Sequence, residues 1–357
     1  MKTLSILLTT ESLGPGGAER QLTELAKGLS IHNDFKLSIV SFSRKSHYDD
    51  EVEKCSPLFR ISDRYDVWRL SVLRNLMKAY DAVRPQIVHS FLVMDSIYVY
   101  LLSYFRDFVW INGSIRDTIG TRDWQQYAKK KLLKLAPYVV ANSHAGLEHY
   151  GFKADDRHVV IHNGIDVGRF SRANSDSPRE FSICSVANFS SYKDHWTLLK
   201  AFKIIADRNV RLYLVGDGKF RPEYESYVRS ENLSGKVIFL GRQTDVEQII
   251  SNMDLGVLCS YKQIGEGFPN AVLEFMASGV PVIASNVGGV KEIIRDGING
   301  FVVDPESPKI LAERIQFTMD NMAQMRPIIE TAFVDVKTRY SSEIMAEKYA
   351  NFYRSIA

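Results

Sequence analysis

The chain has 357 residues, of which 45% are apolar and 24% are charged, and its formal net charge is +3. This length suggests two or three domains that each bury a core, and the composition is that of a globular protein. The small net charge gives no indication of nucleic-acid binding, and no apolar run reaches the ~20 residues that span a bilayer. The three cysteines form neither a metal pattern nor a disulfide framework, which predicts a reducing, cytoplasmic environment.

Short apolar runs alternate with longer helical patterns along the whole chain. The expected strands are residues 4–8, 37–41, 87–89, 108–111, 139–141 and 159–161, then 181–186, 212–215, 237–240, 255–258, 282–284 and 301–303. We interpret the first run as a strand and not as a signal peptide, because it is short and no convincing cleavage site follows it. The alternation predicts parallel sheets covered by helices on both faces. The polar stretch 169–180 is the best candidate for a linker between two such domains.

A glycine-rich loop at residues 265–270 leads into a helical pattern. Gly265 and Gly267 permit tight backbone conformations and a close approach by a ligand. Pro269 suits the first position of a helix, where its missing N–H is not needed. The N–H groups of residues 270–272 would then have no partner within the helix and would point, with the positive end of the helix dipole, at an anion. A phosphate group is the natural ligand for such a site.

Two carboxylates frame this loop, Glu266 within it and Glu274 on the following helix. A carboxylate beside a phosphate is unfavourable unless it binds something neutral, and hydroxyl groups are the obvious partners. Phosphate and hydroxyl sites together suggest a nucleotide that carries a ribose and a sugar. The alternative interpretation is that both residues are ordinary exposed acids, as most Glu residues are.

The spacing of these two acids resembles the E-x7-E motif of family 4 glycosyltransferases, which are retaining enzymes with the GT-B fold. The continuation Met-Ala-Ser-Gly-Val-Pro-Val-Ile-Ala-Ser at 276–285 is similar to the same family. So are Gly-Pro-Gly-Gly-Ala-Glu-Arg at 14–20 and His-Asn-Gly-Ile-Asp at 162–166. The resemblance therefore covers most of the chain, with its segments in the expected order.

The resemblance implies two Rossmann-like α/β domains that face each other across a cleft. Residues 1–168 would form the acceptor-binding domain, and residues 181–340 would bind the nucleotide sugar. Residues 341–357 would form a helix that crosses back to the first domain. In open α/β sheets, ligands bind beyond the carboxyl ends of the strands, which places the expected site residues there.

The second domain is expected to hold the donor. Lys193 would bind the diphosphate, and Asn188 stands where the family usually has an Arg and could donate a hydrogen bond. Gly216 lies in a Gly-Asp-Gly turn after another strand, where an ordinary turn is the alternative. Arg242 and Gln243 lie in the segment that the resemblance assigns to the base. The remaining expected donor residues are Gly267, Phe268, Pro269 and Asn270, with Glu274 on the ribose and Glu266 on the transferred sugar.

The first domain is expected to bind the acceptor and to approach the diphosphate. Gly16 and Gly17 would let the backbone come near the donor. Arg116 and Asp117 follow a strand, where Arg116 would stabilise the leaving diphosphate and Asp117 would orient or deprotonate the acceptor hydroxyl. A surface ion pair between these two is the alternative. Many members of the family place a His in this neighbourhood, and this chain has none there. His89 ends another expected strand and is a second candidate, with a structural role as the alternative.

The chain has no Asp-x-Asp motif that would hold a metal-bound diphosphate, so we expect no metal and no cofactor. A basic and aromatic segment could contact anionic lipid or a lipid diphosphate, although a solvated helix is the alternative. Its residues are Trp124, Tyr127, Lys129, Lys130, Lys131 and Lys134.

The prediction is a retaining transferase that moves a hexose or N-acetylhexosamine, with a UDP-sugar favoured, to a sugar hydroxyl. Resemblance to enzymes of polysaccharide and lipopolysaccharide assembly favours a lipid-linked acceptor and peripheral contact with the inner face of a membrane. The alternatives are an epimerase or phosphorylase of the same fold, or a non-catalytic partner subunit that binds a nucleotide sugar.

Overall fold

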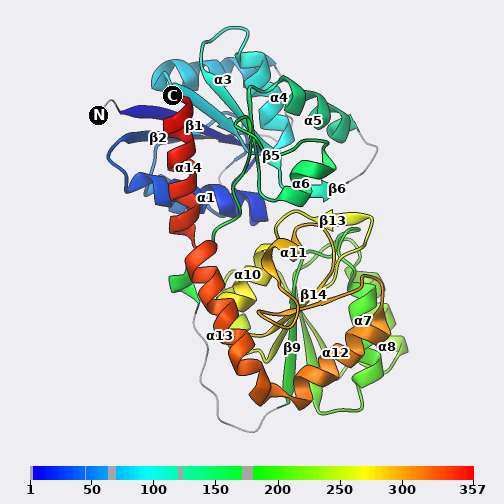
Figure 1. The fold of residues 1–357 in the computed structure, drawn as a ribbon. Coiled ribbons are helices and arrows are strands. Elements are labelled where there is room, and N and C mark those ends of the chain that lie inside the picture. The colour runs from blue at the N-terminus through cyan, green and yellow to red at the C-terminus, as the bar shows by residue number, and fades with distance from the viewer. Residues whose placement is uncertain (1–2, 45, 63–69, 120–123, 171–179) are drawn as a thin grey trace. The chain divides into compact units, whose positions relative to one another are not determined.

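The computed structural model describes residues 3–44, 46–62, 70–119, 124–170 and 180–357. It divides into two compact units (Figure 1). Unit 1 consists of Met1–Gly164 and Ser342–Ala357, and unit 2 is Ile165–Ser341. Most of the expected linker, residues 171–179, lies outside the described residues.

Unit 1 is built on a seven-stranded parallel sheet with the strand order β3-β2-β1-β4-β5-β7-β8. The central strands are almost completely buried, as expected for a parallel sheet covered on both faces. The strands are β1 (Leu4–Thr10), β2 (Phe35–Ser41), β3 (Leu58–Arg60), β4 (Ile87–Ser90), β5 (Val109–Ile115), β7 (Tyr138–Ala141) and β8 (His158–Val160); the short β6 (Asp117–Ile119) follows β5.

The helices of unit 1 connect these strands and cover both faces of the sheet. They are α1 (Gly17–Ser30), α2 (Asp49–Glu53), α3 (Leu70–Val83), α4 (Val93–Leu102), α5 (Trp124–Leu135), α6 (His144–His149) and α14 (Ser342–Ile356). The last of these, at the C-terminal end of the chain, lies beside α1 (Figure 1, red and blue). A Cβ at Gly28 of α1 would lie 2.3 Å from the Cβ of Ala346, so the glycine permits the close approach of the two helices.

Unit 2 contains a six-stranded parallel sheet with the order β11-β10-β9-β12-β14-β15. Its strands are β9 (Phe181–Val186), β10 (Val210–Val215), β11 (Val237–Gly241), β12 (Leu255–Leu258), β14 (Val282–Ser285) and β15 (Phe301–Val303), and β13 (Ile264–Glu266) follows β12 in the chain. Its helices are α7 (His195–Ile205), α8 (Arg221–Ser230), α9 (Val246–Ser251), α10 (Asn270–Ala277), α11 (Val290–Ile293), α12 (Pro308–Asp320) and α13 (Met322–Arg339), with a 3-10 turn at Val167–Arg169. Two apolar clusters flank this sheet, one on each face.

The predicted fold class is therefore confirmed: both units are α/β structures with parallel sheets. Among the described residues, no helix combines the length and the apolar character that crossing a membrane requires. One local expectation is wrong, because α10 begins at Asn270 and Pro269 is the extended residue before it, with φ −73° and ψ 116°.

Candidate functional site

The carboxyl edge of the unit 2 sheet brings three polar side chains together. The Lys193 ammonium forms an ion pair with Oε1 of Glu266, and the Ser260 hydroxyl donates to the same oxygen. The Lys193 and Glu266 side chains are only 13% and 12% exposed, and Ser260 is buried. Lys193 is therefore largely shielded from solvent and paired, unlike a solvated loop lysine.

The backbone fixes Lys193 at this place because the loops after β9 and β12 pair with each other. Lys193 and Ser260 form an isolated antiparallel bridge, and the N–H of Asp194 donates to the carbonyl of Cys259 over 2.9 Å. The Asp194 side chain then caps α7 by accepting the Thr197 N–H over 3.0 Å. Since β9 and β12 are neighbours in the sheet, their following loops emerge side by side.

Glu266 is held from the other side by the turn after β14. Gly288 has φ +48°, and a Cβ there would lie 1.9 Å from the Glu266 carbonyl oxygen. The N–H of Gly289 donates to that carbonyl over 3.0 Å. Only glycine at 288 fits this contact, so the Gly-Gly turn sets the position of the Glu266 backbone.

Glu274 lies on α10 and is 5% exposed. This burial rules out the alternative of an ordinary exposed helix acid. The Cys184 thiol on β9 has a raised pKa because it is buried, and the nearby Glu274 carboxylate acts in the same direction. A charge-bearing carboxyl group in such an environment is a candidate for ligand binding.

The start of α10 differs in one respect from the anion site that the sequence predicts. The Val272 N–H donates to the Pro269 carbonyl over 3.2 Å, so it is not one of the donors that point away from the helix. Phe268 is 3% exposed, and its ring packs against Tyr340 at 5.3 Å between centroids. Phe268 thus fixes the loop by packing, and the neighbouring Gly267 and Pro269 are buried with it.

The glycines of the Gly216-Asp217-Gly218 turn are explained by packing within unit 2. Gly216 has φ +139°, and a Cβ on it would lie 2.1 Å from the Ala187 carbonyl oxygen. A Cβ on Gly218 would lie 2.4 Å from the carbonyl oxygen of Phe189. Both glycines therefore let this turn press against the loop that leads to Lys193.

The remaining expected donor residues of unit 2 lie on its surface. Asn188 is exposed, and its carbonyl accepts the Ser190 N–H over 2.9 Å. Arg242 and Gln243 are also exposed and follow Gly241, where the chain turns with φ +70°. The Gln243 side chain donates to the Leu240 carbonyl over 2.6 Å. These residues stand after β9 and β11, at the same edge of the sheet as Lys193.

In unit 1, Arg116 follows β5 and is held by three groups. Its Nε donates to the Gly113 carbonyl over 2.9 Å, and its guanidinium lies 4.6 Å above the Phe91 ring. A longer hydrogen bond of 3.4 Å reaches the Tyr349 hydroxyl of α14. The C-terminal helix thus supplies one of the groups that orient this arginine.

Asp117 is bound by a lysine that the sequence placed on a solvated surface. Lys129 is 2% exposed, and its ammonium lies 3.1 and 3.2 Å from the two Asp117 carboxylate oxygens. The Tyr150 hydroxyl donates to Asp117 over 2.9 Å. Burial lowers the pKa of Lys129, while the Asp117 charge opposes this shift. Lys129 is therefore a buried partner of Asp117 and does not belong to the exposed basic face.

His89 is completely buried and belongs to the core of unit 1. Its Nδ1 lies 2.7 Å from the hydroxyl of Tyr353 on α14, and a Cβ at Gly113 would lie 2.4 Å from its Nε2. Burial lowers its pKa well below the usual value. His89 therefore anchors the C-terminal helix.

The glycine loop before α1 is closed by Glu19. A Cβ on Gly16 would lie 2.1 Å from Oε2 of Glu19, so the carboxylate folds back over Gly16. Ser12 donates to Glu19 over 3.2 Å, and burial raises the pKa of Glu19. Gly17, the first residue of α1, is exposed. The next turn of α1 binds the segment 162–166. The Gln21 side-chain amide donates to the Gly164 carbonyl and accepts from the Gly164 N–H, each over 2.8 Å.

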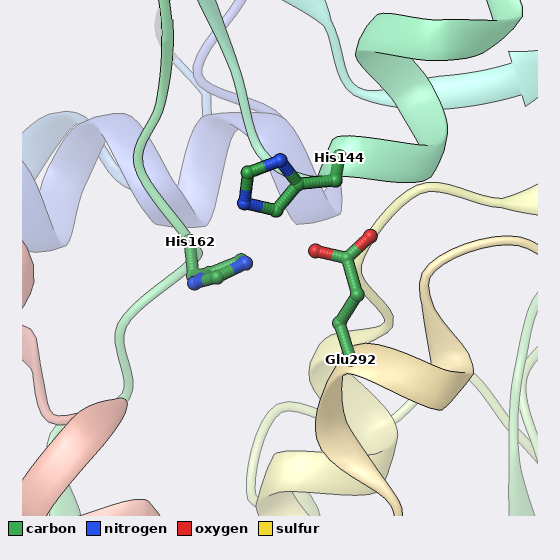
Figure 2. A group of neighbouring side chains, drawn as sticks. All are labelled: His144, His162 and Glu292. Carbon is green, nitrogen blue, oxygen red and sulfur yellow. The ribbon is translucent and has the colours of Figure 1, made fainter. Parts of the chain in front are cut away.

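Figure 2 labels two histidines of unit 1, His144 at the start of α6 and His162 after β8. The two imidazole rings lie 6.1 Å apart between centroids with their planes at 63°. Two imidazoles supply fewer ligands than the three or four of a protein zinc site, so this pair alone does not make a metal centre.

Sequence reasoning missed residues that contact the candidate site residues but lie far from them in the sequence. Ser260 and Gly288 contact Glu266, Lys129 contacts Asp117, and Tyr349 contacts Arg116. The Gly-Gly pair at 288 and 289 was the one visible signal, because adjacent glycines mark a tight turn. A lone Ser, Lys or Tyr carries no such signal.

Two units with parallel sheets and polar groups at the carboxyl edges of those sheets place the chain in the class of open α/β proteins, whose ligands bind at that edge. The family models narrow this class. The model described as "Glycosyltransferase Family 4" matches residues 15–169, and the model described as "Glycosyl transferases group 1" matches residues 169–333. The chain therefore belongs to the family 4 glycosyltransferases, and its two units are those of the GT-B fold.

Two curated relatives each match just over half of the chain. N-acetyl-alpha-D-glucosaminyl L-malate synthase from Bacillus anthracis is 29% identical over 193 residues, which are 54% of this chain and 50% of that protein. The lipopolysaccharide core biosynthesis glycosyltransferase LpsE from Rhizobium meliloti (strain 1021) is 30% identical over 204 residues, which are 56% and 58% of the two chains. The chain thus spans only about half the length of these relatives.

A solved structure supports the fold over the full length. Anabaena Alr3699/HepE in complex with UDP and glucose aligns with a TM-score of 0.82 and 21% identity. The alignment covers 99% of this chain and 100% of that one. At this level of identity, the likeness shows the fold alone.

Proposed function

We propose that the protein is a retaining glycosyltransferase that moves a hexose or N-acetylhexosamine from a nucleotide diphosphate sugar to a sugar hydroxyl. The observation that carries this proposal is the cluster of Lys193, Ser260 and Glu266 at the carboxyl edge of the unit 2 sheet. A cation beside a carboxylate, both largely shielded from water, offers one group to a diphosphate and another to sugar hydroxyls. UDP is the favoured nucleotide, since the similarly folded Anabaena protein was solved with UDP and glucose.

In this proposal, unit 2 binds the donor. Glu274 accepts hydrogen bonds from the ribose hydroxyls, and Glu266 from hydroxyls of the transferred sugar. Lys193 and the N-terminal end of α10 bind the diphosphate, with Asn188, Gly216 and Gly267 close to it and with Arg242 and Gln243 beside the base. Preorganised positive groups are the largest expected contribution to catalysis, because negative charge grows on the leaving phosphate.

The acceptor side of the proposal uses unit 1. The acceptor hydroxyl attacks from the face of the leaving group, and a diphosphate oxygen takes its proton, which retains the configuration. Arg116 stabilises the departing diphosphate, and Asp117 orients the acceptor hydroxyl. In the loop of Gly16 and Gly17, the donor approaches the backbone at the exposed Gly17, since the Glu19 carboxylate lies over Gly16. Lys129 and Tyr150 both bind the Asp117 carboxylate. These contacts support a role in orienting the acceptor hydroxyl more than a role as a general base.

We further propose a saccharide acceptor, lipid-linked and used in the assembly of a surface polysaccharide. The support is the name of the Rhizobium relative, a glycosyltransferase of lipopolysaccharide core biosynthesis. Each transfer would lengthen the sugar chain of such an acceptor by one residue.

The test is a screen of purified full-length protein against UDP-, GDP- and ADP-sugars. Thermal stabilisation and slow release of free nucleotide without acceptor are recorded, with Glu274→Ala as the matched variant. Stabilisation by one donor class that the variant loses supports the proposal and identifies the base. Binding of no donor by a protein that unfolds cooperatively would overturn it, and binding without turnover on any acceptor would favour a non-catalytic partner subunit.

A further inference from the structure

The outer side of α5 carries side chains that a soluble helix normally buries or replaces by polar residues. Trp124 is 50% exposed, Tyr127 is 63% exposed and Leu135 is 53% exposed. Lys130, Lys131 and Lys134 are exposed on the same short helix. These six residues are called the α5 patch below.

The charge of the α5 patch has one sign. Between Trp124 and Leu135 the helix contains four lysines and no Asp or Glu. One of the four, Lys129, is buried against Asp117, and the other three remain on the surface. The Lys131 ammonium lies 4.6 Å from the centroid of the Tyr127 ring, so the two side chains form a cation–π contact.

The segment that follows α4, the helix packed against α5, also exposes aromatic rings. Leu132 and Leu133 of α5 are buried in the same cluster as Val99 and Leu102 of α4, so the two helices lie side by side (Figure 1). Where α4 ends, Tyr104 is 67% exposed and Phe105 is 57% exposed. Two further aromatic rings are therefore exposed on unit 1, at the end of the helix that packs against α5.

A solvated helix and a membrane-surface helix differ in how far their aromatic rings are exposed. A solvated helix uses long lysine stems to cover apolar groups, which would leave the aromatic rings shielded. Trp124 and Tyr127 are instead half exposed or more. Amphipathic aromatic rings beside lysines are the combination that binds at the headgroup level of an anionic bilayer.

We propose that the α5 patch docks unit 1 on the surface of an anionic lipid bilayer. The three lysines bind the negative surface, and the aromatic side chains enter the interfacial region. The opposite side of the helix carries Lys129, whose ammonium binds the Asp117 carboxylate. One side of α5 therefore forms the proposed contact with the bilayer. Its other side binds Asp117, the residue proposed to orient the acceptor.

The second part of this inference rests on the proposed function. If Asp117 orients the acceptor, docking through α5 brings that residue close to a lipid-linked substrate. The docking itself depends only on the exposed side chains of unit 1 and can be tested without any transfer reaction.

The experiment is flotation of the full-length protein with vesicles of two compositions. One set is pure phosphatidylcholine, and the other contains about a third phosphatidylglycerol, enough to give a strongly negative surface. We expect binding to the anionic vesicles alone, and weaker binding when the salt concentration is raised to about 0.5 M. The variant Lys130→Glu, Lys131→Glu, Lys134→Glu should lose about tenfold or more in partitioning, because each lysine near the surface contributes.

A matched variant controls for net charge. Lys200→Glu, Lys309→Glu, Lys337→Glu changes three exposed lysines of unit 2 and should float like the natural protein. Tryptophan fluorescence gives a second readout that needs no charge change. In a Trp68→Phe background the emission should shift to the blue with anionic vesicles. Trp124→Phe should then remove most of that shift, because Trp110 is buried and Trp196 packs against Tyr224 and Tyr227 in unit 2.

The inference fails if the natural protein does not float with anionic vesicles, or if both lysine variants lose binding equally. It also fails if the patch retains RNA or an acidic protein while it ignores lipid, since that would assign the surface to another partner. Donor binding in the nucleotide-sugar screen is independent of these results, so failure of the docking and failure of the proposed activity are distinguishable.

Discussion

Lys193 and Glu266 are 73 residues apart in the chain and form an ion pair at the carboxyl edge of one sheet. The pairing loop after β12 fixes the lysine, and the turn after β14 fixes the glutamate. Each partner lowers the cost of shielding the other from water, which would be high for either charge alone. A phosphate that approached Lys193 would therefore find a cation already in position.

Lys193→Ala should lower kcat by about 10²–10³, the usual effect of removing one group that stabilises developing negative charge. The Michaelis constant for the donor should change much less, because the charge on the diphosphate grows during transfer. Steady-state kinetics with the donor found in the screen give both values. Lys200→Ala, an exposed lysine on α7, is the control and should leave both unchanged. A pure rise in the Michaelis constant would contradict the role in transfer.

Gly288→Ala should disturb Glu266 through the backbone. The new Cβ would collide with the Glu266 carbonyl, and φ at this position is +48°. Gly297→Ala has the same kind of strain, with φ +70°, but no atom within 4 Å of the new Cβ. We expect Gly288→Ala to cost about 1–3 kcal/mol more than the control, the range for overpacking. Denaturant unfolding measures this difference, and equal costs would refute the proposed contact.

The pair of Asp117, whose side chain is 29% exposed, and the buried Lys129 allows stability and function to be separated. Asp117→Asn leaves the Lys129 charge buried without its partner and should destabilise by about 2–3 kcal/mol. Asp117→Asn with Lys129→Met removes both charges and should recover much of that loss. If Asp117 orients the acceptor, the double variant regains stability but not turnover. Recovery of both properties would assign the pair to folding alone, and thermal unfolding with transfer assays decides between these outcomes.

Protonation of His195 should lower the free energy of unfolding in acid. Burial lowers its pKa from 6.5 to about 4, and the nearby Lys193 charge acts in the same direction. Its imidazole is packed edge-on against the Phe189 ring at 4.7 Å. Because the folded pKa lies below the unfolded one, the unfolded state binds more protons between pH 6.5 and about 4.

The sign follows from this difference in bound protons. The contribution of His195 is complete above pH 6.5 and is lost as the pH falls toward about 4, by about 3 kcal/mol at most. His195→Phe should flatten the fall in unfolding free energy over this range. Calorimetry at a series of pH values gives the slope, and an unchanged slope in the variant would show that other groups cause it. The buried His89 contributes in the same direction in both proteins.

Metal-independent transfer is the remaining prediction. If Lys193 and the start of α10 neutralise the diphosphate, activity should survive treatment with EDTA followed by gel filtration. Addition of Mg²⁺ or Mn²⁺ should then change the rate less than about tenfold, since no step would require a Lewis acid. Complete loss of activity with EDTA and its return with one metal would require a different mechanism.

Much of this molecule could be predicted from local patterns. Alternating apolar runs and helices predicted two parallel α/β units, because buried parallel strands read as short apolar segments. The loop before α10 and the two acids around it were visible because glycine, proline and charge at fixed spacing have local conformational consequences. Family resemblance then assigned those acids and Lys193 to one site.

The tertiary structure alone decided which side chains support that site. Ser260 and Gly288 reach Glu266, and Lys129 leaves the basic surface for Asp117. His89, a catalytic candidate from its place after a strand, lies in the core against Tyr353. Each contact joins segments that meet only when distant strands align in one sheet or a helix packs against it. Local sequence determines which element forms, whereas its neighbours, and hence the burial and pairing of each polar group, follow from the packing of the whole unit.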